Sequence, residues 1–445
     1  MESKLVEKIR SREARITVIG LGHIGLVTAV VFAESGFKVV GVDVNPKIVR
    51  IVASGRSHIK EHGLAVLIRK VIKNGNLKVT MNTQLAFKDS DVAIVCVQTP
   101  LTKNKKPDLS QIKKVCEELS KSLSKGKVVI IESTVPPRAT QEIIARILED
   151  RSKLRCGKDF RLAHCPERIS TGHAVQDFTG NARIVGGFDE ESTKIAAELY
   201  SAATRGEILA TDSTTAEVAK LAENSFRDVN IAFANELALI CEEIGVDAAD
   251  AIKLANTHPR VNIHKPGCGV GGPCITKDPY LLLHPVENQN LESRLVLSSR
   301  KLNDYMPEHA VTLVITILKK VKKEIENSKI VILGAAYKGE IDDARNSPAE
   351  KIVHRLRELG AKTIVYDPYT AESFGAPRAR NIWEAAKGAD CVVIVTEHEM
   401  FKTLELKKLR MLMNENPVIF DGRRVIDPMK AKRLGFRYVG IGYNI

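Results

Sequence analysis

Short apolar runs recur through the first two hundred residues of the chain, and most are separated by polar segments with helical spacing. Short apolar runs bounded by turn residues are typical of buried strands. The predicted strands are 16–19, 38–42, 92–97, 128–132, 161–164 and 183–185. Because helical patterns such as 108–124 and 140–151 lie between them, we predict an α/β fold with a mostly parallel, doubly wound sheet.

The pattern changes at residues 213–244, which form a long helical run without proline or glycine. A helix of that length outside a sheet is suited to act as a spacer and a dimer surface. Helix-rich sequence continues to about residue 302, and a second alternating region has predicted strands 329–333, 362–366, 391–395 and 418–420. We therefore predict a sheet domain (1–205), a central helical dimerisation domain (206–310) and a second Rossmann-like sheet domain (311–445).

The first strand leads into a turn that is typical of dinucleotide binding. The turn reads Gly-x-Gly-x-x-Gly, precedes a helix, and is followed by an acid at the end of the second strand. The glycines permit the bend and the approach of a pyrophosphate, and the acid would bind the adenine ribose and repel a 2′-phosphate, so we expect NAD rather than NADP. The predicted cofactor-binding residues here are Gly20, Gly22, His23, Ile24, Gly25, Asp43 and Lys47.

Two further loops follow predicted strands of this sheet, and the carboxyl ends of parallel strands line the ligand crevice of such a sheet. Thr99 and Thr134 lie in the loops after strands 92–97 and 128–132, so we expect their hydroxyl groups to reach cofactor or substrate. The second sheet begins with Gly334-Ala-Ala-Tyr337, which lacks the full dinucleotide fingerprint. We expect that sheet to bind a ligand other than NAD.

One cysteine lies in a glycine-rich stretch, residues 269–279, where the backbone can bend tightly. Lys277 would favour the thiolate of Cys274, and Asp278 would help to activate water. The alternative is a buried structural thiol in a glycine turn. Because apolar neighbours are sparse, we predict a nucleophile, and hence an enzyme that oxidises its substrate with NAD and also bonds to it covalently.

The long helix has polar residues at spacings of three and four, namely Glu217, Lys220, Asn224 and Arg227. These spacings place them on one face. A polar face is usually only solvated, but this one lies beside an apolar strip (Val218, Leu221, Phe226 and Val229), which suits the wall of a half-buried cleft. A lysine and an asparagine one turn apart are suited to stabilise an oxyanion.

The bulk composition excludes several classes of protein. The net charge is +13, but basic and acidic residues are interspersed and only 5% of residues are aromatic, so we expect no nucleic-acid partner. The eight cysteines form no C-x-x-C pair and no zinc-type spacing, which predicts free thiols, no metal site and a reducing, cytoplasmic location. The most apolar window, 16–32, is broken by the glycine turn, so we expect no membrane span.

Taken together, these residues resemble the UDP-glucose/GDP-mannose dehydrogenase family over residues 16 to about 443. The motifs that carry the resemblance are, in order, Gly20-Leu-Gly-His-Ile-Gly25, Gln98-Thr-Pro100, Ser133-Thr-Val-Pro-Pro137, Pro166-Glu-Arg168, Lys220 with Asn224, Gly271-Gly-Pro-Cys274, Arg300 with Asn303-Asp304, and Lys338 with Asp342-Asp343-x-Arg345-x-Ser347-Pro348. A set of this length is far more specific than any single motif.

The resemblance implies a four-electron oxidation that uses two NAD in succession at one site. Cys274 would attack the aldehyde formed at C6 of a UDP-sugar, and the thiohemiacetal would become a thioester that water hydrolyses. Lys220 and Asn224 would stabilise the oxyanions, while Asp278 and Glu167 would manage protons. The implied catalytic residues are therefore Cys274, Lys220, Asn224, Asp278 and Glu167.

The resemblance also implies a homodimer or higher homo-oligomer, in which Arg260 reaches the substrate of the partner subunit. The third domain would hold the nucleotide through Lys338, Arg345 and Asp421 with Arg423, and Lys277 and Arg345 would also approach the cofactor. The implied substrate-binding residues are Glu167, Arg168, Lys220, Asn224, Arg260, Gly271, Lys338 and Arg423.

Within the family, the segments 222–236 and 258–262 and the sequence Pro166-Glu-Arg168 look most like the branch that oxidises UDP-N-acetyl-D-mannosamine. Pro273 stands where that branch commonly has histidine, Lys277 where it has an apolar residue, and Arg138 where glycine usually follows the paired prolines. The implied product is UDP-N-acetyl-D-mannosaminuronate. UDP-N-acetyl-glucosamine and UDP-glucose are the alternative substrates.

Two rivals from other classes remain. A two-electron dehydrogenase of the 3-hydroxy-acid type also pairs a dinucleotide domain with a helical domain and a helix lysine, but it needs neither a thiol nor a third domain. A non-catalytic nucleotide-sugar sensor would not require the full set of polar residues around Cys274.

Overall fold

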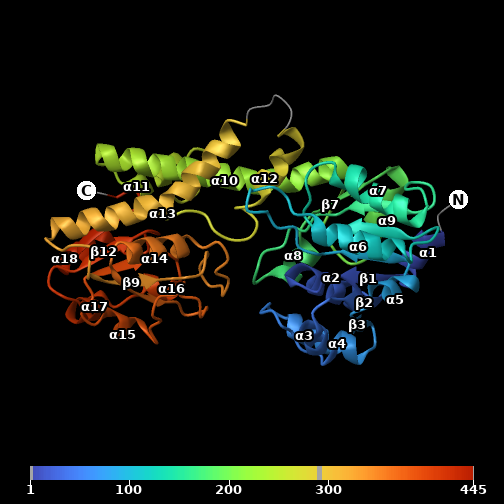
Figure 1. Ribbon diagram of the computed structural model, residues 1–445, viewed down its shortest axis with the longest axis horizontal. Helices are drawn as coiled ribbons and strands as arrows, with labels where there is room; N and C mark the ends of the chain where they lie inside the picture. Colours follow the sequence, from blue (N-terminus) through green and yellow to red (C-terminus); the bar gives the residue numbers. More distant parts are fainter. Residues whose placement is uncertain (1–3, 288–292, 444–445) are drawn as a thin grey trace. The chain divides into compact units, whose positions relative to one another are not determined.

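The computed structural model describes residues 4–287 and 293–443 and forms two compact units (Figure 1). Unit 1 contains the described residues up to 223 together with 280–287, and unit 2 contains 224–279 and 293–443. The division falls inside helix α10 (Ser213–Ile244), whose bounds are those predicted for the long helix. The three-domain division remains a prediction.

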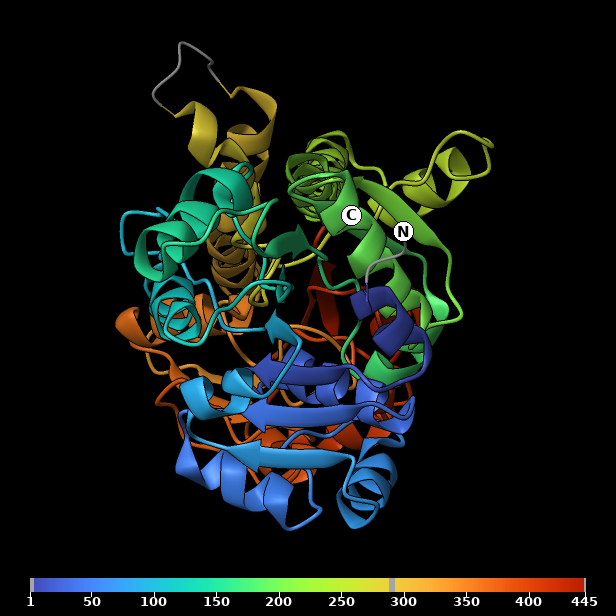
Figure 2. The same cartoon turned by 90° about the vertical axis from the view of Figure 1, so that its right-hand side faces the viewer.

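Unit 1 is built on an eight-stranded sheet with the order β3-β2-β1-β4-β5-β6-β7-β8. All neighbouring strands are parallel except β6 and β7, and the first three strands lie side by side in Figure 2. The strands are β1 (Arg15–Ile19), β2 (Lys38–Val42), β3 (Leu77–Thr80), β4 (Val92–Val95), β5 (Val128–Ile131), β6 (Arg161–His164), β7 (Arg183–Gly187) and β8 (Ile208–Asp212). The order from β3 to β6 is that of a dinucleotide-binding sheet, which confirms the predicted fold class.

Alternate residues of these strands pack on opposite faces of the sheet. Ile16 and Val18 of β1 lie in one apolar core, and Ile19 lies in the other. The first core is covered by α1 (Lys4–Arg10), α2 (His23–Glu34), α4 (Leu64–Lys73), α8 (Ala174–Gly180) and α9 (Glu190–Ser201). The second is covered by α5 (Thr83–Lys88), α6 (Ser110–Ser120), a π-helix (Thr140–Ile144) and α7 (Ala145–Ser152).

Two strands of unit 1 were not predicted from the sequence. β3 has the sequence Leu-Lys-Val-Thr, and only Leu77 is buried in it. β8 is an edge strand with no buried residue. Both lie at the sides of the sheet, where one edge is unpaired and burial is incomplete, so neither carries the continuous apolar signal of a central strand.

Unit 2 is built on a five-stranded parallel sheet with the order β10-β9-β11-β12-β13. The strands are β9 (Lys329–Leu333), β10 (Lys362–Tyr366), β11 (Cys391–Ile394), β12 (Val418–Asp421) and β13 (Arg437–Gly440). One core packs against α10, α13 (Leu295–Lys320) and α14 (Pro348–Glu358). The other packs against α15 (Ile382–Ala386), α16 (Glu399–Lys402), α17 (Leu406–Leu412) and α18 (Pro428–Arg433). The order reverses between β9 and β11, and ligands bind at such a switch point.

The predicted helix-rich region up to about residue 302 contains one long segment without helix, which includes the predicted glycine-rich turn. After α11 (Ala248–Ala255), residues 256–277 contain neither helix nor strand, and α12 (Asp278–Leu283) follows. Three prolines and four glycines interrupt this segment, and neither residue type sustains a helix. The segment is therefore a long ordered loop that leads to Cys274. Within the described ranges, no helix has both the length and the apolar character needed to cross a membrane.

Candidate active site

The glycine turn of unit 1 brings the start of α2 against the end of β1. Gly20 has a φ of +89°, and its N–H donates to the carbonyl oxygen of Val42 at 2.8 Å. A Cβ on Gly25 would lie 1.8 Å from the carbonyl oxygen of Gly20, so no side chain fits there. A Cβ on Gly22 would meet nothing within 4 Å, so this side of the turn is open to a ligand.

The acid that follows β2 shapes the same turn. One carboxylate oxygen of Asp43 accepts a hydrogen bond from the N–H of Leu21 at 2.9 Å, and the other accepts from Asn45 at 2.8 Å. Lys47 is exposed at the beginning of α3 (Pro46–Ala53), where the Asn45 side chain caps the helix. The predicted residues of the turn and Asp43 therefore lie at one place, with an open N-terminus of α2 beside a carboxylate. This arrangement fits a dinucleotide with a free ribose diol.

A second carboxylate beside this turn was missed by sequence reasoning. Glu61 lies between α3 and α4, and its side chain is fully buried. It accepts hydrogen bonds from the N–H groups of Gly172 at 2.7 Å and Ala174 at 3.0 Å, and one of its oxygens lies 2.8 Å from His23 Nε2. Glu61 thus joins the glycine turn to the loop after Glu167. The residues whose N–H groups it accepts, Gly172 and Ala174, are more than a hundred residues away, so no local pattern indicates it.

The loops after β4 and β5 are tied together. The hydroxyl group of Thr99 donates to the carbonyl oxygen of Thr134 at 2.5 Å, and the Ser133 hydroxyl donates to that of Val97 at 2.7 Å. Thr99 is buried and Thr134 is half-buried. Both loops thus lie at the carboxyl edge of the sheet, as predicted, and the Thr99 hydroxyl fixes the path of the second loop.

Glu217 in the first turns of α10 holds the segment that follows Pro136-Pro137. Its carboxylate accepts hydrogen bonds from the N–H of Arg138 at 2.6 Å, the N–H of Thr140 at 2.8 Å and the Thr140 hydroxyl at 2.6 Å. Burial raises the pKa of Glu217 to about 7, although these donors favour the ionised form. Arg138 has a φ of +71°, a left-handed conformation that favours glycine. This agrees with the glycine that usually follows the paired prolines in the family, where this chain has arginine.

Lys220 lies one turn further along α10 and pairs with Glu167. The Lys220 Nζ lies 3.2 Å from a Glu167 carboxylate oxygen, and both side chains are largely buried. The other oxygen of Glu167 accepts a hydrogen bond from the N–H of Ile169. Arg168 donates to the carbonyl oxygen of Ala182 and pairs with Glu223, both at 2.8 Å. The structure therefore brings together Lys220 and Glu167, two residues to which the family resemblance assigns catalytic roles.

The predicted division of α10 into a polar face and an apolar strip is only partly correct. Glu217, Lys220 and Asn224 are buried, whereas Arg227 is exposed. In the apolar strip, Leu221 is buried, but Val218 and Phe226 are exposed. The polar residues are buried because each has a specific partner, which helical spacing alone does not reveal.

In unit 2, Cys274 is the exposed one of the eight cysteines, all of which the structure describes. It follows Gly271 and Gly272, which pack against Tyr337. A Cβ on Gly272 would lie 2.9 Å from the tyrosine ring. Burial and the charges of Asp343 and Cys274 raise the pKa of Tyr337, so the phenol and the thiol lie within electrostatic reach. Cys268 is fully buried, and burial raises its pKa to about 12, so it is a packed structural thiol.

The residues after Cys274 turn back on it. The N–H groups of Lys277 and Asp278 both donate to the carbonyl oxygen of Cys274 at 2.9 Å. Asp278 is buried at the start of α12, accepts a hydrogen bond from Asn224 Nδ2 at 2.6 Å, and lies 3.8 Å from Lys277 Nζ. Unit 2 thus places Asn224, Lys277 and Asp278 around the segment that carries the thiol.

The carboxyl edge of the second sheet carries the predicted nucleotide-binding residues. Lys338 is exposed in the loop after β9. Arg423 follows β12, and its Nε donates to the carbonyl oxygen of Val395 at 2.9 Å. Asp421 is fully buried and accepts hydrogen bonds from the N–H groups of Arg423 and Ile426. Arg423 is therefore held at the switch-point side of the sheet by the strand ends themselves.

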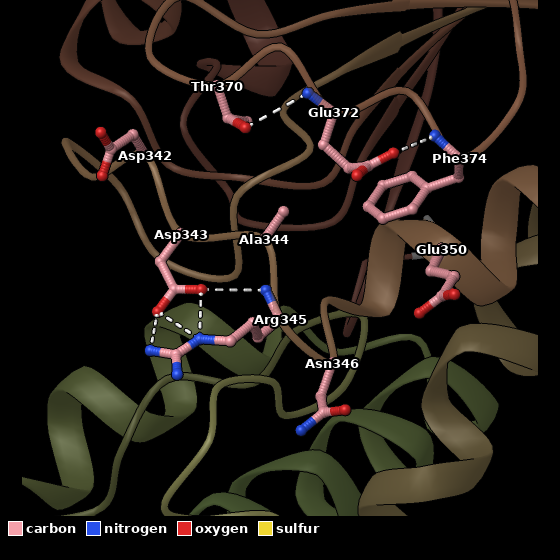
Figure 3. A pocket seen from close by; sticks show the side chains of 9 residues that line it. All are labelled: Asp342, Asp343, Ala344, Arg345, Asn346, Glu350, Thr370, Glu372 and Phe374. Atoms are coloured by element: carbon pink, nitrogen blue, oxygen red, sulfur yellow. Dashed lines mark hydrogen bonds and ion pairs between the residues drawn. The ribbon is translucent and has the colours of Figure 1, made fainter. Parts of the chain in front are cut away.

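A cavity of about 490 Å³ lies beside this edge (Figure 3). Four carboxylates line it, and its one arginine, Arg345, forms a bidentate ion pair with Asp343 at 2.6–3.0 Å. The other carboxylates are Asp342, Glu350 and Glu372. Because these carboxylates repel a phosphate group, the cavity is not suited to hold the diphosphate of a nucleotide.

Comparison with known proteins places the chain in a family. The family model described as the UDP-glucose/GDP-mannose dehydrogenase family, NAD binding domain, matches residues 14–204. The models of the central domain and of the UDP binding domain match residues 214–305 and 331–428. The chain belongs to the UDP-glucose/GDP-mannose dehydrogenase family. It is an NAD-dependent dehydrogenase, and the predicted family and cofactor are confirmed.

Several relatives match this family member along nearly its whole length. UDP-N-acetyl-D-mannosamine dehydrogenase from Pyrococcus horikoshii is 42% identical over 428 residues, which cover 96% of this chain and 99% of the relative. A solved structure of UDP-D-ManNAc dehydrogenase from the same organism has a TM-score of 0.91 and covers 97% of this chain and 99% of its own. NDP-N-acetyl-D-galactosaminuronic acid dehydrogenase from Methanosarcina mazei is 35% identical, with a TM-score of 0.88 and coverage of 100% and 98%.

The domain models assign ligands to the two sheets of the dehydrogenase. The glycine turn, Asp43, Thr99 and Thr134 lie in the NAD binding domain, whereas Lys338 and Arg423 lie in the UDP binding domain. The prediction that the second sheet binds a ligand other than NAD agrees with that assignment.

Replacement of Glu217 by glutamine tests the buried carboxylate. The folded protein holds the Glu217 proton up to about pH 7, whereas the unfolded chain loses it near the ordinary value of 4.5. The stability that Glu217 contributes is therefore full below about pH 4.5 and falls as the pH rises to about 7. We expect the free energy of unfolding of the wild type, relative to Glu217→Gln, to fall by up to about 3 kcal/mol over this range.

Denaturant unfolding of both proteins at half-unit steps of pH measures this difference. A difference that is constant or that rises with pH would show that the carboxylate is ionised throughout, held by its three donors.

Proposed function

We propose that this enzyme oxidises C6 of UDP-N-acetyl-D-mannosamine to the carboxylate, giving UDP-N-acetyl-D-mannosaminuronate. The observation that carries the proposal is the exposed thiol of Cys274, flanked by glycines, on a chain that also has NAD-binding and UDP-binding domains. The choice of sugar rests on relatives named for UDP-N-acetyl-D-mannosamine that are about 40% identical over nearly the whole chain.

NAD, when bound, accepts one hydride from the C6 alcohol and a second from the adduct on Cys274. The chain supplies the covalent chemistry between these two events. The Cys274 sulfur adds to the aldehyde carbon to give a thiohemiacetal, and after the second oxidation the resulting thioester is attacked by water, which releases the carboxylate and restores the thiol. Lys277, the residue before Asp278 and three residues after Cys274, favours the thiolate by its charge.

Lys220 and Asn224 are proposed to stabilise the oxygen that becomes negative at C6. The Lys220 ammonium is already ordered by Glu167 at 3.2 Å. Asn224 gives one N–H to Asp278, and its amide has a second N–H with which to bind an oxyanion. Glu167 and Asp278 are the proton-accepting groups, and each is oriented by a hydrogen bond to the oxyanion-stabilising residue beside it. This pairing supports the assignment of acid–base roles to both carboxylates.

We propose that Gly22, His23 and Ile24 at the start of α2 would hold the pyrophosphate of NAD, since a Cβ on Gly22 would meet nothing within 4 Å. Asp43 would bind the adenine ribose, and Lys47, exposed on α3, would belong to the same cofactor-binding set. Thr99 and Thr134 are assigned to the nicotinamide side, since their loops follow β4 and β5. Lys277 and Arg345 are assigned to the cofactor by the family resemblance alone.

The nucleotide of the substrate is assigned to Lys338 and Arg423 at the switch point of the second sheet. Two cations at the carboxyl edge of a parallel sheet suit a diphosphate. Arg168 and Gly271 complete the proposed substrate-binding set. Arg168 would have to give up part of its ion pair with Glu223 to reach a substrate.

A homodimer is proposed on the exposed surface of α10. Phe226, Phe233, Ile240 and Ile244 are between 49% and 66% exposed and recur at spacings of seven and four, so they form one apolar stripe. An exposed apolar stripe along a long helix suits a self-complementary interface between two copies of the chain. Arg260 is exposed in the loop tied to the same helix through Asn230 and Asn262, which supports its assignment to a partner's substrate.

All eight cysteines are free, and burial raises the pKa of five of them to about 12 or beyond. Secreted proteins more often use such a number of cysteines in disulfides. We therefore propose a reducing compartment, the cytoplasm, as the site of action.

Replacement of Cys274 by alanine tests the mechanism. We expect overall turnover to fall by about a thousandfold or more, because no sulfur remains to hold the aldehyde for the second oxidation. NAD affinity, measured by fluorescence titration, should stay at the wild-type value. Cys156→Ala, at a half-buried thiol of the NAD binding domain, is the matched control and should keep wild-type turnover. Wild-type turnover in Cys274→Ala would remove covalent catalysis.

A panel of substrates tests the reaction and the sugar. Purified protein is offered NAD with UDP-N-acetyl-D-mannosamine, UDP-N-acetyl-glucosamine, UDP-N-acetyl-galactosamine, UDP-glucose or GDP-mannose, and NADH is read at its absorbance maximum. We expect the highest kcat/KM with the mannosamine sugar and about two NADH for each sugar consumed. One NADH for each sugar would instead favour a simple alcohol dehydrogenase.

Mixing two inactive variants tests the dimer. Arg260→Ala lacks the group offered to the partner, and Cys274→Ala lacks the thiol. If Arg260 acts in the partner's site, each mixed dimer regains one intact site, so random reassociation restores about one quarter of wild-type activity. The measurement is activity after the variants are dissociated and reassociated in equal amounts. Activity no higher than that of the separate variants would place Arg260 outside the partner's site.

A further inference from the structure

A buried polar network in unit 2 joins α10 to α13. Arg300 is 1% exposed and forms an ion pair with Asp228, which is fully buried. Asn303 Nδ2 donates to Asp228 Oδ1 at 2.8 Å and to the Asp228 carbonyl oxygen at 2.9 Å. A buried charge pair of this kind is retained only where further hydrogen bonds satisfy it. The network uses the Arg300 and Asn303 motif, to which the proposed reaction gives no role.

The network continues to the loop that carries Cys274. Asn235 Nδ2 donates to Asn303 Oδ1 at 2.8 Å, and Asn235 Oδ1 accepts a hydrogen bond from the N–H of Gly267 at 2.9 Å. Asn235 is fully buried, and Gly267 begins the glycine-rich part of the loop. A Cβ on Gly269 would lie 3.1 Å from the carbonyl oxygen of Asn303, so the loop rests directly on α13.

The Arg300–Asp228 ion pair fixes which group donates and which accepts in every hydrogen bond of the network, as far as Gly267. Arg300 can only donate, so Asp228 accepts from it; Asp228 is also the acceptor for the amide N–H groups of Asn303. Asn303 therefore presents its oxygen to Asn235, and Asn235 must present its own oxygen to Gly267. A rotated amide at either asparagine would place like groups against each other in a buried setting, which is strongly unfavourable.

The far part of the same loop is held by other contacts. The N–H of Gly272 donates to the carbonyl oxygen of Arg345 at 3.0 Å, and the Tyr337 ring covers Gly272. The sulfur of Cys268 lies against Gly422, where a Cβ would be 2.0 Å from it. Asn235 is thus the polar anchor at the beginning of the loop, and the segment from Gly267 to Cys274 is held at both ends.

We propose that Asn235 is a positioning residue for Cys274. The Asp228–Arg300 pair fixes the orientation of the Asn303 amide, which fixes that of Asn235, so the Asn235 oxygen faces the N–H of Gly267 and sets the path of the loop that carries the thiol. The inference rests on the proposed function, in which Cys274 is the nucleophile. A residue that only stabilised the fold would change activity no more than any other variant of equal stability.

Asn235→Ala removes the acceptor for Gly267 and the donor for Asn303. Asn235→Asp keeps an acceptor for Gly267, and in its protonated form, which burial favours, its O–H can still donate to Asn303 Oδ1. Val314→Ala is the matched control, because Val314 is a buried residue of α13 that belongs to the apolar core and not to the network. The three variants are compared at a temperature well below the melting temperature of the least stable.

We expect Asn235→Ala to lower kcat by about tenfold to a hundredfold, since a small displacement of a reacting group has effects of this size. KM for NAD should stay within about twofold of wild type, because the NAD binding domain is untouched. Asn235→Asp should keep clearly more of kcat than Asn235→Ala, and Val314→Ala should keep nearly all of it.

Alkylation of the thiol by iodoacetamide gives a readout that does not depend on turnover. Cys274 is the exposed thiol among the eight, so the initial rate in the full-length protein reports on it. Asn235→Ala should change that rate by about fivefold or more, and Val314→Ala should leave it unchanged. Equal kcat and equal alkylation rates in Asn235→Ala and Val314→Ala would overturn the inference.

The same experiments separate this inference from the proposed function. If Cys274→Ala kept wild-type turnover, the mechanism would fail, yet a changed alkylation rate in Asn235→Ala would still support the positioning of the loop. If Asn235→Ala does not fold, Asn235→Ser, whose hydroxyl is too short to reach both Asn303 and Gly267, replaces it in both measurements, and an alkylation rate and kcat equal to those of Val314→Ala would overturn the inference.

Discussion

Buried carboxylates that accept backbone N–H groups hold the loops at the strand ends in both units. Glu61 and Glu217 each accept two such bonds in unit 1, whereas in unit 2 Asp421 accepts two and Asp367 accepts four. A buried carboxyl group that loses its donors is left without hydrogen-bond partners, which is unfavourable for the neutral acid and more so for the carboxylate. A displaced loop therefore forfeits more than its own contacts, which keeps the catalytic and binding segments in place.

The first strand of each sheet is followed by a similar glycine turn, but the acid beside the turn has different partners in the two sheets. Gly20 and Gly334 both have a positive φ, and each donates to the last residue of the neighbouring strand. Asp43 and Asp367 follow those strands, but Asp367 is fully occupied: it accepts four backbone N–H groups and pairs with His398 at 3.0 Å. Burial opposes its ionisation, yet these donors hold the pKa of Asp367 below its ordinary value. Its carboxylate has no capacity left for a ribose, which fits the match of the NAD binding domain to the first sheet and of the UDP binding domain to the second.

The sequence was sufficient for the features that depend on neighbouring residues. The central strands, the bounds of α10 and the glycine turn follow from apolar runs, helix-forming composition and a short motif, and the family follows from motifs in order. Glu61 and Asn235 were not found, because their partners are distant in sequence and no spacing marks them. The buried polar face of α10 was only half predicted, since burial depends on partners from other elements. The catalytic and binding roles of individual residues remain predictions.

The stacking of Tyr337 on Gly272 has a consequence for how this protein can vary. Any larger residue at the glycine would collide with the ring, and a smaller residue in place of the tyrosine would leave a hollow under the backbone that bears the thiol. The two positions are coupled sterically although 65 residues separate them in the numbering. A substitution at either position is therefore constrained by the residue at the other, and a related protein that differs at one would have to differ at both.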